Sequence, residues 1–527
     1  MLNKLKKVFR SKALSGGTKI AINCEKLETR VAVMEDGILE EYTVERVDDV
    51  NIVGSIYKGI VRNIEPGLKA MFVDIGLEKN AFLHFWDAIP EALDSGMEEI
   101  RRGGGKGGKG GKKKRPRITS QDIPKLYPAG SEVLLQVSKG PIGTKGPRVT
   151  TNISLAGRYM VLMPRNDQFG ISRKIEDPQE RARLRQVMEK LQVPEGMGII
   201  LRTVSTGQRL RYFVRDLSIL LEQWAEIEKN AVANKAPTCA FREPDLIERT
   251  VRDFLTDEIE EVLCDDAHAV ERMKDLVGTI SRRSKKRIHL FEDSEPIFEK
   301  LKIQKQIDDA FFRQVWLPSG GYLVIDETEA MIAIDVNTGR AKSITKMILQ
   351  TNVEAAREVA RQLKLRNIGG LIVVDFIDMR NRRDQQAVYR AMKDQLKHDK
   401  AKTQALQISQ LGLMEMTRQR LHESLSMTVT EPCHYCQGRG RVKTAESMSV
   451  ELQRTVSAVL AKYRDRVSEL VVVVHPEVME RLRTKDSELL VDLERQHQAR
   501  LTFRSDPTFH REKLAILDGS TNKEISA

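Results

Sequence analysis

Ile332-Ala-Ile-Asp-Val-Asn337, followed one helix-length later by Gly370-Leu-Ile-Val-Val-Asp375, is the part of the sequence that decides the fold. Both runs are apolar and carry a carboxylate near their ends, which predicts two buried strands ending near Asp335 and Asp375. Between them, residues 348–367 place apolar side chains at the i, i+3, i+4, i+7 spacing of an amphipathic helix, which two glycines would end. The sequence therefore predicts a strand-helix-strand unit.

The two aspartates of this unit predict a metal site. A right-handed crossover sets the strands parallel in one sheet, so Asp335 and Asp375 would open toward the same crevice at the carboxyl ends of the strands. Two converging carboxylates are costly without a cation, and Mg²⁺ takes oxygen ligands. The pattern favours metal-assisted phosphodiester hydrolysis. The alternative is that each aspartate merely ends its strand.

Size and charge point to a soluble, multidomain protein with a polyanionic partner. The chain has 527 residues, 40% of them hydrophobic and 31% charged, with a net charge of +12. Residues 101–117 contain nine basic residues and seven glycines, which predicts a disordered loop that contacts nucleic-acid phosphates through sequence-independent attraction. The alternative for this run is a solvated segment without a partner.

Cysteine content and hydropathy indicate a cytoplasmic protein. Five cysteines in a chain of 527 residues do not form a disulfide framework. No run approaches the roughly 18 apolar residues of a membrane span. The first ten residues place Leu2, Leu5 and Phe9 on one helical face, so this segment is either a helix lying on a membrane surface or a frayed terminus.

The first third of the chain has the pattern of strands. Residues 19–50 alternate apolar and polar side chains with a hairpin signal at Glu35-Asp-Gly37, and short strands punctuated by glycine between residues 54 and 137 predict a small barrel. Phe72 and Phe82 lie in this barrel region, and Lys145 follows it. Aromatic and basic residues of this kind form a stacking surface for single-stranded nucleic acid, and the alternative for the two phenylalanines is core packing.

Arginines of the next region are candidates for binding an anion. Arg173, Arg202 and Thr203 each follow an apolar stretch, and guanidinium groups pair bidentately with phosphate oxygens. Helices are expected at about 177–191, 210–229 and 243–276, from their apolar spacing.

A cysteine pair follows the strand-helix-strand unit. Cys433-His-Tyr-Cys436, with trailing glycines, has the shape of a zinc knuckle, whereas Cys24, Cys239 and Cys264 are expected to be isolated. Structural zinc takes four ligands, so two protomers donating two thiolates each would complete the site across a homodimer. The alternative is a pair of redox-active or free thiols. Residues 445–527 predict a last small α/β unit.

Taken in order, these motifs resemble the ribonuclease E/G family of bacterial endoribonucleases. The resemblance rests on IAIDVN, GGLIVVDFIDM, GLMEMTRQR and CxxCxGxG at their observed separations, and it extends from about Lys19 to near the end of the chain. Pro141-Ile-Gly-Thr-Lys-Gly146, and the absence of a long disordered tail, are more similar to the ribonuclease G branch.

The resemblance implies specific roles for matching residues. Asp335 and Asp375 match the family's Mg²⁺ ligands, and Asn337 matches a catalytic asparagine. The pocket for an RNA 5′-monophosphate is matched by Arg173, Arg202 and Thr203. The face of the barrel that binds RNA is matched by Phe72, Phe82 and Lys145. The Zn²⁺ link between two subunits is matched by Cys433 and Cys436. The implied activity is cleavage of single-stranded, A/U-rich RNA to leave 5′-phosphate and 3′-hydroxyl ends, in ribosomal RNA processing and messenger RNA decay. The implied assembly is a homodimer that can pair into a dimer of dimers.

The fold implied by the resemblance is a multidomain α/β chain. After a basic extension at 1–18 it has a split ribonuclease H-like subdomain, 19–50 with 250–309, around an OB-fold RNA-binding barrel at 51–151 and a 5′-sensor region at 152–249. A deoxyribonuclease-I-like catalytic subdomain at 310–429, a zinc link at 430–444 and a small C-terminal domain at 445–527 follow. The basic run 101–117 is an insertion in the barrel.

Two rival functions share some of these features. A non-catalytic RNA-binding or ribosome-assembly protein would share the charge and the barrel, but would have no need of Asp335, Asn337 and Asp375 together. A metal-dependent DNA nuclease would share the acidic site, but the barrel and the arginines favour single-stranded RNA.

Overall fold

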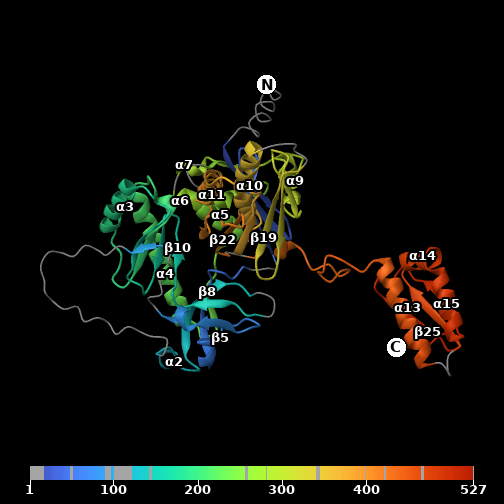
Figure 1. Ribbon diagram of the computed structural model, residues 1–527. Coiled ribbons are helices and arrows are strands. Elements are labelled where there is room, and N and C mark those ends of the chain that lie inside the picture. The colour runs from blue at the N-terminus through green and yellow to red at the C-terminus, as the bar shows by residue number, and fades with distance from the viewer. Residues whose placement is uncertain are drawn as a thin grey trace. The chain divides into compact units, whose positions relative to one another are not determined.

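The computed structural model describes residues 17–47, 51–89, 97–99, 122–141, 145–255, 259–280, 282–339, 345–397, 399–420, 423–463 and 468–525. The chain separates into two compact units, Met1–Thr428 and Val429–Ala527. The predictions made for residues 1–16 and for the basic run 101–117 lie outside the described residues. Figure 1 labels many of the elements named below.

The candidate catalytic part is a six-stranded sheet with the order β17-β18-β19-β20-β22-β21. Its strands are β17 (Gln314–Trp316), β18 (Tyr322–Glu327), β19 (Ile332–Asn337), β20 (Gly370–Asp375), β21 (Thr403–Ala405) and β22 (Leu413–Arg418). Of the strand pairs, β19 with β20 is parallel and the others are antiparallel. The predicted strand-helix-strand unit is confirmed, because α10 (Thr345–Leu365) connects β19 to β20.

Helices α10 and α11 (Arg382–Leu396) share a core with this sheet. Buried Ala356 and Val359 of α10 and Val388 of α11 pack with the inward-facing residues of the central strands, such as Ile334 and Val374. This packing fixes the strand ends that carry the acidic residues. Helix α12 (Leu425–Val429) follows β22 in the chain.

A second sheet is assembled from two distant parts of the chain, in the order β16-β15-β1-β2-β3. Its strands are β1 (Thr18–Cys24), β2 (Glu28–Glu35), β3 (Ile38–Arg46), β15 (Ile259–Cys264) and β16 (Ile288–Leu290). The accompanying helices are α5 (Leu246–Phe254), α6 (Ala267–Ile280), α7 (Arg282–Lys285), α8 (Ile297–Lys300) and α9 (Gln304–Asp309). The hairpin predicted at residues 35–37 is confirmed: Glu35 pairs with Ile38, and Asp36 and Gly37 have φ values of 51° and 81°. Both central residues with positive φ are what a type I′ turn requires.

The helix expected over 243–276 is wrong. That segment contains α5 and α6 with β15 between them, and β15 pairs in parallel with β1. The strand is short and carries two consecutive glutamates, Glu260 and Glu261, so its own sequence lacks clear alternation. Pairing with a strand about 240 residues away decides its structure.

Five strands close into a barrel, because β4 pairs with β8 as well as with β5. They are β4 (Ile56–Glu65), β5 (Ala70–Asp74), β6 (Ala81–His84), β8 (Glu132–Lys139) and β9 (Arg148–Thr150). The one-turn helices η1 (Pro66–Leu68), η2 (Phe85–Ala88) and α2 (Ile123–Leu126) connect them, and β14 (Thr238–Phe241) adds to β4. Fully buried Met71, Leu83 and Leu135 fill the interior, which is consistent with an OB-like fold.

A fourth sheet in the same unit has the order β10-β11-β13-β12-β7. Its strands are β7 (Met97–Glu99), β10 (Leu155–Ala156), β11 (Met160–Met163), β12 (Phe169–Ser172) and β13 (Gly198–Leu201). Its helices are α3 (Pro178–Lys190), η3 (Thr203–Ser205) and α4 (Leu210–Ala233), so the helices predicted near 177–191 and 210–229 are confirmed. Strand β7, just before the basic run, pairs with β12 of this sheet rather than with a strand of the barrel.

The second unit is a small α/β fold. Strand β23 (Glu469–Val474) pairs in parallel with β24 (Arg500–Ser505) and antiparallel with β25 (Leu514–Asp518). Helices α13 (Ala445–Lys462), α14 (Pro476–Thr484) and α15 (Ser487–His497) accompany this sheet. The predicted α/β character of this unit is confirmed. Among the described residues of the whole chain, no helix is both long enough and apolar enough to cross a membrane.

Candidate active site

The two aspartates singled out in the sequence lie side by side on neighbouring strands. Asp335 of β19 and Asp375 of β20 are register partners in the parallel pair, and both side chains are exposed. Alternation explains this, because the residues before them, Ile334 and Val374, point into the core and are at most 2% exposed. Both carboxylates therefore open to solvent near the carboxyl ends of the two central strands.

Asn337 belongs to the same group. Its Nδ2 donates a hydrogen bond of 2.8 Å to Asp335 Oδ2. The side-chain oxygen of Asn337, Oδ1, takes no part in that bond. On the other strand, the fully buried Asn352 of α10 donates to Ile377 O at 2.8 Å and accepts from Ile377 N at 3.1 Å. These two hydrogen bonds fix the backbone just beyond Asp375. Residues 340–344, which follow Asn337 closely, lie outside the described residues.

Negative charges at the site disfavour one another. Partial burial, followed by the negative charges of Asp335 and Asp378, raises the pKa of Asp375 above its ordinary value. Asp378, which sequence reasoning did not single out, is thus a further carboxylate whose charge reaches Asp375. The signal was present in the sequence, since Asp378 lies three residues after Asp375. An arrangement in which like charges oppose ionisation fits oxygen coordination of Mg²⁺.

Three arginines beside the site were also missed. Arg380, Arg382 and Arg383 are exposed, and none forms an ion pair with another described residue. They lie just before and in the first turn of α11, where Asn381 accepts a hydrogen bond from the Arg383 backbone N–H. Positive charge together with a helix N-terminus attracts phosphate groups. The basic run that begins five residues after Asp375 was the available signal.

The structure brings Ser172, the neighbour of Arg173, next to Thr203 at the ends of parallel strands. Ile171 of β12 and Leu201 of β13 are register partners, so the residues that follow them emerge side by side. The hydroxyls of Ser172 and Thr203 are 3.4 Å apart, and Arg173 is exposed. This arrangement can hold an anionic group.

Arg202 is held differently from Arg173. Its Nη2 pairs with Asp253 at 2.7 Å, and its Nη1 donates to Gly157 O at 2.6 Å. Burial opposes ionisation of Asp253, but the Arg202 and Arg252 charges outweigh it and lower the pKa of Asp253. A phosphate bound here would have to use the remaining N–H groups of Arg202 or replace Asp253.

A lysine next to Arg173 connects this region to the catalytic sheet. Lys174 Nζ donates to the backbone oxygen of Asp399. The Asp399 carboxylate in turn pairs with Arg418 of β22 at 2.6 Å, and both of these side chains are almost fully buried. The region of Arg173 is therefore in direct contact with the sheet that carries Asp375.

The barrel brings its predicted aromatic residues together. Phe72 of β5 and Phe82 of β6 are register partners, and their half-buried rings meet edge to face with centroids 5.9 Å apart. The segment of exposed Lys145 lies beside them, because Phe82 N donates to Pro147 O at 2.7 Å. Partly exposed aromatics with a nearby lysine can stack bases and pair with phosphates.

The cysteine knuckle has the local geometry of a metal-binding turn. Gln437, Gly438 and Gly440 have positive φ, and Gly440 N donates to Cys436 Sγ at 3.3 Å. Backbone N–H groups of Cys436 and Tyr435 lower the pKa of Cys433 below its usual range, which favours a thiolate. One chain supplies two of the four ligands that structural zinc takes.

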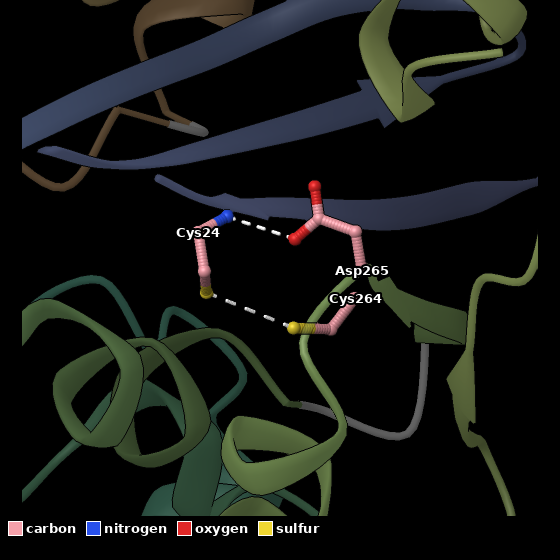
Figure 2. A group of neighbouring side chains, drawn as sticks. All are labelled: Cys24, Cys264 and Asp265. Carbon is pink, nitrogen blue, oxygen red and sulfur yellow. Dashed lines mark hydrogen bonds between the residues drawn. The ribbon is translucent and has the colours of Figure 1, made fainter. Parts of the chain in front are cut away.

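The expectation that Cys24 and Cys264 are isolated is wrong. Their sulfur atoms are 3.9 Å apart, because β1 and β15 are neighbours in one sheet (Figure 2). The error follows from the missed strand β15, because only its pairing with β1 places Cys264 close to Cys24. Cys239 is exposed, and its sulfur donates to the Phe241 backbone oxygen.

The fold and these sites define a multidomain α/β protein with two exposed aspartates paired on central strands of one sheet, a closed barrel, and arginines that follow β12 and β13. The family described as Ribonuclease E/G matches residues 154–421, and a domain described as RNase E/G, Thioredoxin-like matches residues 432–519. The chain therefore belongs to the ribonuclease E/G family.

Individual relatives are similar along nearly the whole chain. Ribonuclease G of Escherichia coli strain K12 is 34% identical over 502 residues, which cover 95% of this chain and 99% of that protein. Ribonuclease G of Haemophilus influenzae is 34% identical over 505 residues with the same coverage, and Ribonuclease E of that organism is 35% identical over 509 residues, 52% of its length. The chain thus matches full-length Ribonuclease G proteins and about half of a Ribonuclease E.

Proposed function

We propose that this protein is a Mg²⁺-dependent endoribonuclease that cleaves single-stranded, A/U-rich RNA and leaves 5′-phosphate and 3′-hydroxyl ends. The observation that carries the proposal is the register pairing of exposed Asp335 and Asp375 on the two central strands of the sheet, with Asn337 bonded to Asp335. Membership of the ribonuclease E/G family supports RNA as the substrate. Ribosomal RNA processing and messenger RNA decay are the corresponding cellular roles.

The residues present fit a hard cation. Asp335 and Asp375 would hold Mg²⁺ through their oxygens, and the raised pKa of Asp375 reflects in part the repulsion that a cation would remove. When bound, Mg²⁺ would polarise the scissile phosphate and lower the pKa of a coordinated water. Asn337 orients the Asp335 carboxylate through its Nδ2, and its carbonyl oxygen can accept a hydrogen bond from water near the phosphate.

Other residues position the RNA strand. Arg380, Arg382 and Arg383 are exposed next to the acidic site and would neutralise phosphates that flank the cleaved bond. Phe72, Phe82 and Lys145 would grip the single strand on the barrel.

Stimulation by a 5′-monophosphate would use Arg173, Thr203 and Arg202. The paired strand ends at β12 and β13 support this site, and Lys174 gives it a physical connection to the catalytic sheet. RNA with a 5′-hydroxyl would lack the charge that these groups recognise, so it would be cleaved more slowly.

A zinc ion shared between two subunits would make the protein a homodimer. Cys433 and Cys436 supply half of a tetrahedral thiolate set, and the N–H groups around the sulfurs favour thiolates. A second copy of the chain is the simplest source of the other half.

Cleavage of a 5′-monophosphorylated single-stranded RNA tests the proposal. The wild type is expected to cut with Mg²⁺ and not with chelator, while Asp335→Asn and Asp375→Asn lose about 100-fold or more in kcat/KM. Asp326→Asn is the matched control, since Asp326 lies on neighbouring β18 and pairs with Arg313. Equal cutting by all four proteins would remove the two aspartates from the chemistry. RNA binding by a wild type that never cuts would favour a non-catalytic RNA-binding protein.

A further inference from the structure

Two cysteines meet at the carboxyl ends of two parallel strands, away from the acidic site. Cys264 ends β15 and is fully buried, and its register partner on β1 is Ile22. Cys24 lies two residues beyond Ile22, so its side chain points to the same face of the sheet as Cys264. Their Sγ atoms are 3.9 Å apart (Figure 2).

Asp265 completes this group. Its Oδ1 accepts a hydrogen bond of 2.8 Å from Cys24 N, and its Oδ2 accepts one of 2.6 Å from Asn23 Nδ2. One ligand atom from each of Cys24, Cys264 and Asp265 lies within 4.8 Å of the other two. Each carboxylate oxygen keeps a second lone pair beside its hydrogen bond, so Asp265 can still coordinate an ion.

We propose that Cys24, Cys264 and Asp265 form a binding site for a thiophilic divalent cation of the zinc class. Two sulfurs at about 2.3 Å from a tetrahedral zinc are roughly 3.8 Å from each other, close to the separation found here. Two thiolates and one carboxylate are ligands that zinc takes. Cys24 is only half-buried, so solvent can reach the remaining position and the ion has a path of entry.

A disulfide is a poorer fit to the same pair. It requires the sulfurs to approach to about 2.0 Å, with Cα atoms usually no more than about 6.8 Å apart. The two-residue offset along parallel strands places these Cα atoms roughly 8 Å apart. The metal site needs no movement of the strands.

Binding would join the two distant parts of the chain that make the second sheet. Both cysteines would bind as thiolates, so their thiol protons are released to solvent when the ion binds. Because Cys24 and Cys264 are 240 residues apart in sequence, an ion bound to the folded state alone would stabilise this sheet.

The test uses the full-length Cys433→Ser/Cys436→Ser variant, so that the knuckle contributes no ion. After incubation with Zn²⁺ and gel filtration, about one zinc per chain is expected, and Co²⁺ should give a thiolate charge-transfer absorption. Adding Cys24→Ser should lower retained zinc at least tenfold and abolish the absorption, and Asp265→Asn should weaken binding. Cys239→Ser is the matched control and should change neither readout, since Cys239 is exposed and outside the group.

Two results would overturn the proposal: a Cys433→Ser/Cys436→Ser protein that retains no zinc, or unchanged retention after Cys24→Ser. A Cys24–Cys264 disulfide found by peptide mass analysis of the metal-treated protein would also overturn it. Cys264 is fully buried and Cys264→Ser can disturb folding, so half-buried Cys24 carries the test, with circular dichroism as the check on its fold. Loss of RNA cleavage is not a readout, which keeps this test separate from that of the proposed function.

Discussion

Asp375 shows how a functional carboxylate works against stability. Its pKa is raised by partial burial and by Asp335 and Asp378, so the ionised form is less favourable in the folded chain than in the unfolded chain. The stability associated with a raised pKa is present at low pH and is lost as pH rises through the folded value. At neutral pH, ionised Asp375 therefore destabilises the metal-free protein.

Replacement of Asp375 by asparagine should stabilise the metal-free protein slightly at pH 7. We expect a rise in Tm of no more than about 2 °C by calorimetry in chelator, because the side chain is exposed and solvent screens its charge. The difference from wild type should shrink as pH falls below the raised pKa of Asp375 and protonates the wild-type carboxyl. Asp326→Asn should not stabilise, since Arg313 lowers the pKa of Asp326. A lower Tm for Asp375→Asn in chelator would contradict this explanation.

Individual site residues differ in how far the sequence predicts them. The pairing of Asp335 with Asp375 was predictable, because a polar side chain at the end of an apolar strand stands out and the parallel crossover sets the register. The pairing of Arg202 with Asp253 was not, since these residues belong to different elements and only their packing brings them together. Asp378 and the three arginines were visible in the sequence but were passed over beside a stronger signal.

At the scale of elements, one ion pair holds the edge of the catalytic sheet. Arg418 of β22 bonds to Asp399 through Nε and Nη2 and donates to Ile368 O through Nη1. In register, Arg418 lies opposite Gly370 of β20 and Thr403 of β21. The pair therefore ties β21 and β22 to the beginning of the strand that carries Asp375.

Asp399→Ala should destabilise the first unit strongly. It leaves the buried Arg418 guanidinium without its counter-charge, which costs about 3–5 kcal/mol. Asp394→Ala is the matched control, because the Asp394 side chain is 71% exposed and its pair with Lys397 is worth about 0–1 kcal/mol. Urea unfolding followed by circular dichroism measures both. An equal loss in the free energy of unfolding for the two substitutions would show that the buried pair does not stabilise the sheet.

The local sequence is enough to predict some elements, whereas others take their structure from pairing with distant strands. The β19-α10-β20 unit was predictable because strong apolar periodicity, glycines and length all agree. Strand β15 was not, since its six residues lie between two helices and become a strand through pairing with β1. Strand β7 has only three residues and pairs with β12 across a long segment of chain. Such strands are set by tertiary contacts, which override local propensity.

At the scale of the whole molecule, the chain is two compact units. The first unit contains the acidic site, the barrel, and the arginines near β12 and β13. The second contains the cysteine knuckle and its small sheet. The resemblance predicted this sequence of parts, while the named fold types of the subdomains and their boundaries stay predictions.

Loss of the knuckle should convert a dimer into monomers. Cys433→Ser/Cys436→Ser removes the thiolates that we propose to share a zinc ion, so light scattering should give half the wild-type mass. Cys239→Ser leaves these ligands intact and should stay dimeric. A metal-free dimer of normal mass would count against the zinc link. Circular dichroism should be unchanged in both variants, because the knuckle residues are not in a hydrophobic core.

The central claim is that Asp335 and Asp375 share one divalent ion. Anomalous diffraction from crystals soaked in Mn²⁺ tests it most directly, because Mn²⁺ takes the same oxygen ligands as Mg²⁺ and can be located by its own signal. We predict a single peak between the two carboxylates, with an oxygen of each in its coordination shell, and no peak there in Asp375→Asn crystals. Carboxylates turned apart with no anomalous signal between them would contradict the account.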